Sequence, residues 1–119
     1  MKAKPPLNVL LVITDQQRAT DTGFMGNPIL KTPHLDALAA RAMVFDNAWV
    51  ANPVCMPNRS SLMTGRMPSA HGVIFNDRSL EPGVNTFVRG FRKAGYQTAL
   101  MGKSHLQHGV SKNSMVPFR

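Results

Sequence analysis

The chain has 119 residues, a hydrophobic fraction of 43% and a formal net charge of +8. This length suits one domain with a core, and no apolar run reaches the roughly 18 to 20 residues of a transmembrane helix. The 14 lysines and arginines are spread along the chain and aromatic residues make up only 7%, which argues against a nucleic-acid partner and for a small anionic substrate. We therefore expect no nucleic-acid partner and no membrane association. A solvated basic surface would also explain the charge.

The start of the chain has no pattern of a signal peptide. The apolar stretch at residues 7–14 is interrupted by Asn8 and leads into Asp15 rather than into a small-residue cleavage site. This pattern predicts a cytoplasmic location. The single cysteine excludes an internal disulfide framework.

The first predicted elements are a strand and a helix. Residues 9–13 are a continuous β-branched and aliphatic run, typical of a strand buried on both faces of a parallel sheet. A helix is predicted to follow Thr32, with Thr32 as its N-cap and Pro33 at its first position. Residues 44–50 are a second, less regular strand candidate. The apolar stripe of the helix is formed by Leu35, Leu38, Ala39 and Ala42.

A short helix is predicted around the cysteine. Proline suits a first helical turn because its missing N–H costs nothing there, so the helix should open near Met56 or Pro57 and stop at Gly65. Cys55 then lies at the N-terminal end, where free N–H groups and the helix dipole suit an anion. Arg59 follows at i+4 and shares its face. A lone cysteine is often only a small buried hydrophobe, but these neighbours favour a reactive group.

The remaining elements complete the fold prediction. Residues 81–83 form a turn, and an amphipathic helix is predicted from Val84 or Thr86 to Ala94. A third strand is predicted at residues 97–101. The order strand, helix, strand, helix, helix, strand predicts an α/β fold with a largely parallel sheet flanked by helices. Residues 107–119 lack periodicity and are predicted to be loop.

Polar groups follow the first and third predicted strands. Asp15 and Gln16 come after residues 9–13, at the strand end where α/β proteins bind ligands, and their oxygens suit Ca²⁺ or Mg²⁺. An aspartate there is otherwise often a helix cap. Lys103 and His105 come after residues 97–101, and i and i+2 point the same way in extended backbone. Lysine can bind an anion and histidine can move a proton near neutral pH. A Lys-x-His pair on its own is usually just part of the exposed surface.

The cysteine run resembles the signature of a known family. Cys-Met-Pro-Asn-Arg at residues 55–59 and Leu-Met-Thr-Gly-Arg at residues 62–66 are similar to the sulfatase signature of the alkaline phosphatase superfamily. Asn58 departs from the usual Ser or Ala. Residues 12–17 resemble the first metal motif of these enzymes, and residues 95–105 resemble their second signature.

The resemblance implies a partial alkaline-phosphatase-like fold and a sulfatase site. In that family the cysteine is oxidised to formylglycine, whose hydrated gem-diol attacks a sulfate ester. A divalent cation, Ca²⁺ more than Mg²⁺, would be held by Asp15, Gln16 and the modified Cys55. Arg59 would steady the diol.

Three further residues are implied to face the substrate. Lys103 would hold a sulfate oxygen, and His105 would bond the diol or the sulfate. Asn76 resembles an active-site asparagine of choline-sulfatase-like members, while a turn-forming pair with Asp77 explains it equally well. The implied partners are a sulfate ester and the formylglycine-generating enzyme.

The resemblance covers the front part of a sulfatase catalytic domain. The family needs a later Asp followed by Asn or His, whereas none of the six acidic residues lies after position 81. We expect weak metal binding and little turnover for these 119 residues alone, with the missing C-terminal part as a partner. The alternatives are a phosphodiester or phosphonate monoester hydrolase of the same superfamily, and a non-catalytic oxyanion-binding fragment.

Overall fold

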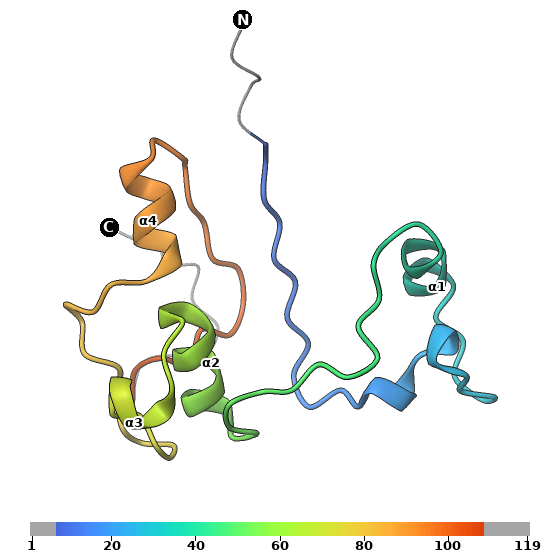
Figure 1. Ribbon diagram of the computed structural model, residues 1–119, viewed down its shortest axis with the longest axis horizontal. Helices are drawn as coiled ribbons and strands as arrows, with labels where there is room; N and C mark the ends of the chain where they lie inside the picture. The colour runs from blue at the N-terminus through green and yellow to red at the C-terminus, as the bar shows by residue number, and fades with distance from the viewer. Residues whose placement is uncertain (1–6, 109–119) are drawn as a thin grey trace, which may run out of the picture. The chain divides into compact units, whose positions relative to one another are not determined.

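The structure is a computed structural model, and it describes residues 7–108. The chain divides into two compact units, Met1–Asn47 and Ala48–Arg119. The helices of both units are drawn in Figure 1. We describe each unit by itself.

Residues 7–47 of the first unit contain three short helical elements. These are the 3-10 turns η1 (Ala19–Asp21) and η2 (Gly23–Met25) and the helix α1 (Pro33–Ala39). The predicted helix after Thr32 is thus confirmed, although it ends before the predicted apolar position Ala42.

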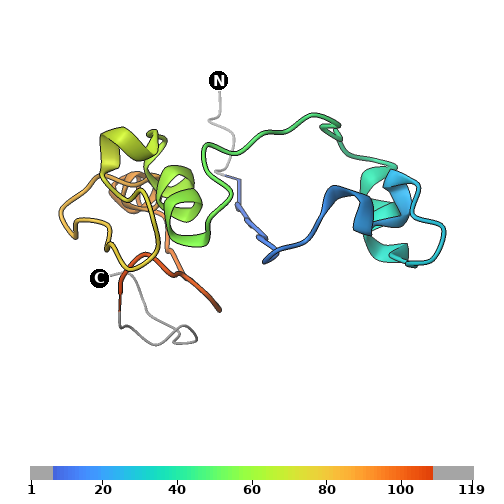
Figure 2. The ribbon, with the colours of Figure 1, turned by 90° about the horizontal axis from the view of Figure 1, so that it is seen from below.

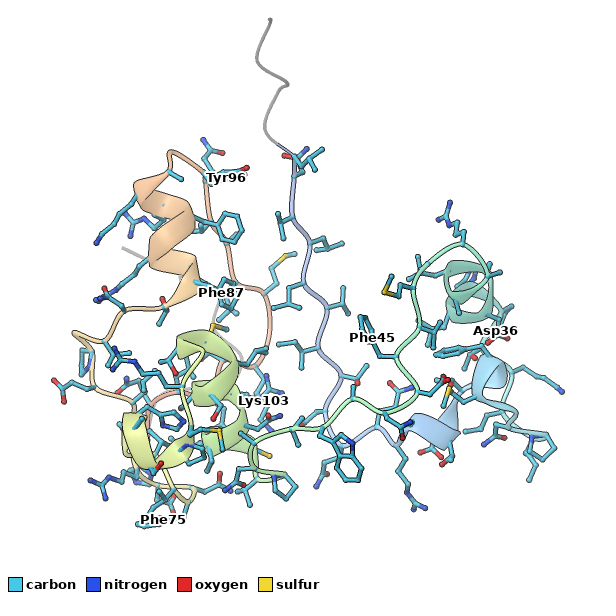
Figure 3. All side chains as sticks on the ribbon, in the orientation of Figure 1. Asp36, Phe45, Phe75, Phe87, Tyr96 and Lys103 are labelled. Carbon is cyan, nitrogen blue, oxygen red and sulfur yellow. The ribbon has the colours of Figure 1, made fainter. Side chains whose placement is uncertain are left out.

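Hydrogen bonds around Asp36 join η2 to α1. The carboxylate oxygen Oδ1 of Asp36 accepts from the backbone N–H of Phe24 and from the hydroxyl of Thr32, both at 2.8 Å. The Thr32 hydroxyl in turn accepts from the N–H of Gly23 at 2.8 Å. Thr32 therefore precedes α1 as predicted, but its hydroxyl binds the 3-10 turn instead of capping the helix. Figure 3 shows Asp36 at this junction.

The second unit contains α2 (Cys55–Thr64), α3 (Pro68–His71) and α4 (Phe87–Lys93), with α2 packed against the other two helices. The predicted helix boundaries of α2 and α4 are nearly right. α2 begins at Cys55 itself and is followed by Gly65 in the left-handed conformation, at φ 67°. The hydroxyl of Thr86 caps α4 by accepting the N–H of Arg89. α3 was not predicted.

A small hydrophobic core lies beside the beginning of α2. Met56 and Val73 are each 1% exposed and Leu80 is 4% exposed, with Val84 and Leu106 packed against them. The backbone N–H of Leu80 also donates to the carbonyl of Leu106 at 2.8 Å. This core therefore ties the chain after residue 103 to the helix that begins with the cysteine.

The predicted parallel sheet is not present in the part of the chain that the structure describes, because residues 7–108 contain no strand. Residues 9–13 run as an extended trace (Figure 1), and the turned view of Figure 2 likewise shows no arrows. A strand is defined by backbone hydrogen bonds to a neighbouring strand, which the runs at residues 9–13, 44–50 and 97–101 do not have here. Most of their apolar side chains are accordingly exposed, for example Leu10 at 84% and Trp49 at 91%.

Two remaining predictions concern the tail and the membrane. Residues 107 and 108 lie outside any helix, as predicted, and residues 109–119 of the predicted loop lie outside the described residues. Among the described helices, none is long and apolar enough to cross a membrane.

Candidate functional site

Cys55 occupies the first position of α2, as the sequence predicted. The residue before it, Val54, makes no side-chain cap. The side chain of Asn76 takes over this function, since its Oδ1 accepts the backbone N–H of Met56 at 3.1 Å. An amide oxygen there satisfies one of the donors that a helix N-terminus leaves open. The side chain of Asn76 therefore lies at the N-terminal end of α2, at the residue that follows Cys55.

Lys103 approaches the cysteine from a distant part of the sequence. Its Nζ lies 3.9 Å from Sγ of Cys55, and its backbone carbonyl accepts a hydrogen bond of 2.9 Å from Nη1 of Arg59. The side chain of Arg59 is only 8% exposed. The structure thus brings Cys55, Arg59 and Lys103 together at the first two turns of α2, and Figure 3 shows Lys103 beside this helix.

Backbone and side-chain contacts hold the segment that carries Lys103. Besides the bond between Leu80 and Leu106, the side-chain amide of Gln107 donates to the carbonyl of Leu80 at 2.6 Å. The N–H of His108 donates to the hydroxyl of Ser79 at 2.8 Å. The segment after residue 103 is therefore fixed along residues 79–80.

His105 is placed differently from the prediction. We expected Lys103 and His105 to follow a strand and to point the same way in extended backbone. Residues 97–101 do not form a strand, and His105 adopts a left-handed conformation, with φ 48°. This conformation is uncommon for a residue with a side chain, so the i,i+2 argument does not apply at this position. His105 is half-buried, two residues from the lysine that contacts Cys55.

His71 is a structural residue of the site that the sequence analysis did not single out. It is 9% exposed, and its Nδ1 accepts the N–H of Val73 at 3.1 Å. Because Nδ1 accepts, the neutral ring carries its proton on Nε2, which lies 2.9 Å from the hydroxyl of Ser61 and donates to it. Burial lowers the pKa of His71 and outweighs its backbone hydrogen bond, which acts in the opposite direction. The ring therefore joins α2 to α3 in its neutral form.

Two of the three predicted metal ligands, Asp15 and Gln16, lie in the first unit, and both are exposed. Gln16 has a left-handed backbone, with φ 55°, a conformation often found at functional positions. No group of three or more His, Cys, Asp or Glu side chains that could hold a metal ion occurs in residues 7–108. One carboxylate and one amide fall short of the roughly six to eight oxygens that Ca²⁺ takes. The described residues therefore do not form a complete cation site.

The second unit still forms a site with a recognisable chemistry. A helix N-terminus, a buried arginine and a lysine surround one side chain, and each of these groups can stabilise negative charge. The arrangement can hold an anion against the residue at position 55.

Comparison with known proteins identifies the family. The Sulfatase family model matches residues 7–116, and the chain belongs to this family. The chain is 44% identical over 110 residues to an ulvan-active sulfatase of Formosa agariphila, covering 92% of this chain and 21% of that protein. It is 34% identical over 119 residues to human N-acetylgalactosamine-6-sulfatase, covering 89% and 23% of the two proteins.

A solved structure gives a similar result. A crystal structure from Bacteroides fragilis that is described as a sulfatase has a TM-score of 0.76 and 31% identity, and the match covers 86% of this chain and 24% of that one. The chain therefore spans between a fifth and a quarter of the length of these relatives.

Proposed function

We propose that this chain is the N-terminal segment of a sulfuric ester hydrolase whose nucleophile is a formylglycine made from Cys55. The observation that carries the proposal is the contact of 3.9 Å between Nζ of Lys103 and Sγ of Cys55 at the start of α2. A cation and a helix N-terminus meet at the one side chain that the family motif assigns to this modification. Formylglycine supplies, as a hydrated aldehyde, the hydroxyl group that attacks the sulfur of the ester.

The roles of the basic residues follow from their contacts. The ammonium group of Lys103 lies where it can bind an oxygen of a sulfate group seated against position 55. Such a fixed charge stabilises the negative charge that develops during ester cleavage. Arg59 is buried and binds the backbone of Lys103, so it holds this lysine in place while its own charge adds to the field. His105 would supply a hydrogen-bond donor or a proton near neutral pH.

Asn76 would contribute the other half of its amide to the substrate. Its Oδ1 accepts from the N–H of Met56, and this bond assigns Nδ2 as the donor. An NH₂ group beside Cys55 suits a sulfate oxygen. Asn76 would therefore join the helix N-terminus to the substrate.

The proposed cation, Ca²⁺ more than Mg²⁺, is tied to Asp15, Gln16 and the modified residue at position 55. It would supply positive charge that polarises the sulfate group. Since the described residues do not complete its coordination, further ligands would come from outside this segment. Calorimetric titration with CaCl₂ and MgCl₂ tests this part. We expect weak Ca²⁺ binding that is lost in Asp15→Asn, and unchanged Ca²⁺ binding in that variant would contradict the assignment.

We also propose that the complete domain has the alkaline-phosphatase-like α/β fold. The runs at residues 9–13, 44–50 and 97–101 are apolar and largely exposed here. They would become strands of a parallel sheet when other strands pair with them. A cytoplasmic location is part of the same proposal, and fractionation of cells that express the protein would test it.

The central test is the chemical state of position 55. The protein is co-expressed with a formylglycine-generating enzyme, and the peptide that spans Cys55 is examined by mass spectrometry. We expect an aldehyde in the wild-type protein and in Asn58→Ser, which restores a residue usual in the family, and a thiol in Arg59→Ala, which breaks the motif. An unmodified wild-type thiol, in cells that convert another sulfatase, would contradict the proposal.

A second experiment separates the ester classes. A version of the protein that includes the remainder of the domain is assayed with an aryl sulfate, an aryl phosphodiester and an aryl phosphonate monoester. We expect the sulfate ester to be hydrolysed fastest, with Lys103→Met losing most of this activity. Preference for either phosphorus ester would favour the alternative hydrolases, and sulfate binding without turnover would favour a non-catalytic oxyanion-binding protein.

A further inference from the structure

We propose that Met56 is a positioning residue that holds Asn76 and the loop after it against the start of α2. Its side chain is 1% exposed. The backbone N–H of Met56 donates to Oδ1 of Asn76 at 3.1 Å, and its sulfur accepts the backbone N–H of the next residue, Asp77, at 3.3 Å. One residue thus binds two consecutive residues of a loop 20 positions away along the chain.

The backbone conformation of Asp77 explains why the bond from its N–H to the sulfur of Met56 matters. Asp77 has a φ of 74°, in the left-handed region that is unfavourable for residues with a Cβ atom. A thioether is a weak acceptor, but this sulfur belongs to a side chain that is only 1% exposed, and it lies 3.3 Å from the backbone nitrogen of Asp77. The contact holds the strained residue, and through it the amide of the neighbouring Asn76, in place beside Cys55.

Packing alone is the competing explanation, because Met56 belongs to the hydrophobic core with Val73 and Leu80. Met63 provides the matched control. It lies on the same helix, is 6% exposed and is a second buried methionine. Replacement of either residue by leucine removes a buried thioether at similar volume, whereas only Met56→Leu removes the acceptor of Asp77.

The importance of this contact for catalysis rests on the proposed function, but its test uses no sulfate ester. Backbone hydrogen exchange is measured by NMR on the protein. In Met56→Leu we expect the protection of the Asp77 backbone amide to fall about fivefold, as for the loss of one hydrogen bond. The backbone amide of residue 56, which donates to Asn76, should lose protection as well. Met63→Leu should leave both amides unchanged. Equal protection at Asp77 in all three proteins would overturn the proposal.

A rescue variant distinguishes positioning from packing. Asp77→Gly removes the cost of the left-handed backbone, so the double variant Met56→Leu/Asp77→Gly should regain protection at position 56 and the chemical shifts of the Asn76 side-chain amide. A defect caused by lost packing would not be repaired by glycine. If the amide at position 56 remained unprotected in the double variant, the proposal would be overturned.

A measurement without substitution covers the case in which Met56→Leu does not fold. In protein labelled with ⁷⁷Se-selenomethionine, a coupling across the hydrogen bond should connect the selenium of residue 56 with the amide proton of Asp77. Its absence would overturn the proposal. Failure to find formylglycine at position 55 would contradict the proposed function and leave these results unaffected.

Discussion

The guanidinium group of Arg59 donates a hydrogen bond from Nη1 to the backbone carbonyl oxygen of Lys103 at 2.9 Å, and the two residues are 44 positions apart in the chain. This bond connects α2 with the segment that brings an ammonium group to Cys55. The bond uses the backbone of Lys103, while the ammonium group of its side chain lies 3.9 Å from Sγ of Cys55. A substitution of Arg59 should therefore disturb both the stability of the unit and the position of Lys103.

The first prediction concerns this bond. Arg59→Met removes a nearly buried charge and its donors, and should lower the free energy of unfolding by about 1.5 to 3 kcal/mol, the usual contribution of a hydrogen bond to a charged group. Arg59→Lys should recover only part of it, because an ammonium group lacks the planar fork of arginine. Urea denaturation followed by circular dichroism measures the difference.

Arg89 is the matched control, because it also donates to backbone carbonyls, those of Gly83 and Pro82, but is exposed. Arg89→Met should cost less, since water can replace an exposed bond. Equal losses at Arg59 and Arg89 would show that burial does not strengthen the bond to Lys103.

The second prediction is a pH dependence caused by His71. Burial lowers its pKa below the ordinary 6.5, so the unfolded chain takes up a proton before the folded chain does as the pH falls. The unfolded state then binds more protons, and the free energy of unfolding decreases with falling pH. The contribution is fully present above about pH 6.5, decreases below it, and is lost once the pH falls below the lowered pKa of the folded state. Urea titrations between pH 8 and pH 4 measure this slope.

His71→Gln removes the titrating ring, so this variant should be less stable at pH 8 but should show a shallower slope below about pH 6.5. His34→Gln is the control, because His34 lies exposed on α1. It should retain the wild-type slope. A wild-type slope in His71→Gln would contradict the role of this histidine.

The third prediction concerns the first unit, where Gly23 lies against Asp36. A Cβ atom at Gly23 would come within 2.6 Å of Oδ2 of Asp36. The carboxylate cannot move aside without losing its bonds to Phe24 and Thr32. Gly23→Ala should therefore destabilise the unit by about 1 to 3 kcal/mol, as for overpacking.

Gly83→Ala controls for the addition of a methyl group, since nothing lies within 4 Å of the new atom. It should change stability by less than about 0.5 kcal/mol. Thermal denaturation monitored by circular dichroism separates the two variants. A neutral Gly23→Ala would mean that the carboxylate of Asp36 is not fixed.

The fourth prediction compares Gly→Ala substitutions at two glycines of the second unit, which should change the free energy of unfolding in opposite directions. Gly65 ends α2 with a φ of 67°, so Gly65→Ala should cost about 1 to 2 kcal/mol for placing a Cβ in the left-handed region. Gly90 lies inside α4, and no atom lies within 4 Å of an added Cβ. Gly90→Ala should stabilise by about 0.5 to 1 kcal/mol. Chemical denaturation of both variants measures the difference, and changes of the same sign would contradict the argument.

Local rules explain which parts of the fold could be predicted from the sequence. The end of α2 at Gly65 depends on residues within one turn, and its predicted position was confirmed. Thr86 was predicted only as one of two possible starts of α4, and it proves to be the N-cap of that helix. The strands could not be predicted from local patterns in the same way. A hydrophobic run indicates where a strand can form, but the strand itself needs a hydrogen-bonded neighbour, and residues 7–108 contain no such pair.

The same distinction applies to the site. The spacing of Cys55 and Arg59 is a property of one helix, and it predicted their common location. The approach of Lys103 was suggested by the motif but depends on the contacts of Leu80 with Leu106, which no local pattern reveals. His71 was missed for this reason, because its partner Ser61 lies on another helix and neither residue is unusual in sequence.

The exposed run at residues 44–50 has a practical consequence. Trp49 lies in it, is 91% exposed and is the single tryptophan of the sequence. Its fluorescence is therefore an intrinsic optical reporter for this part of the chain. Emission should occur at the long wavelengths of a hydrated indole here, and should move to shorter wavelengths when a neighbouring strand covers this run.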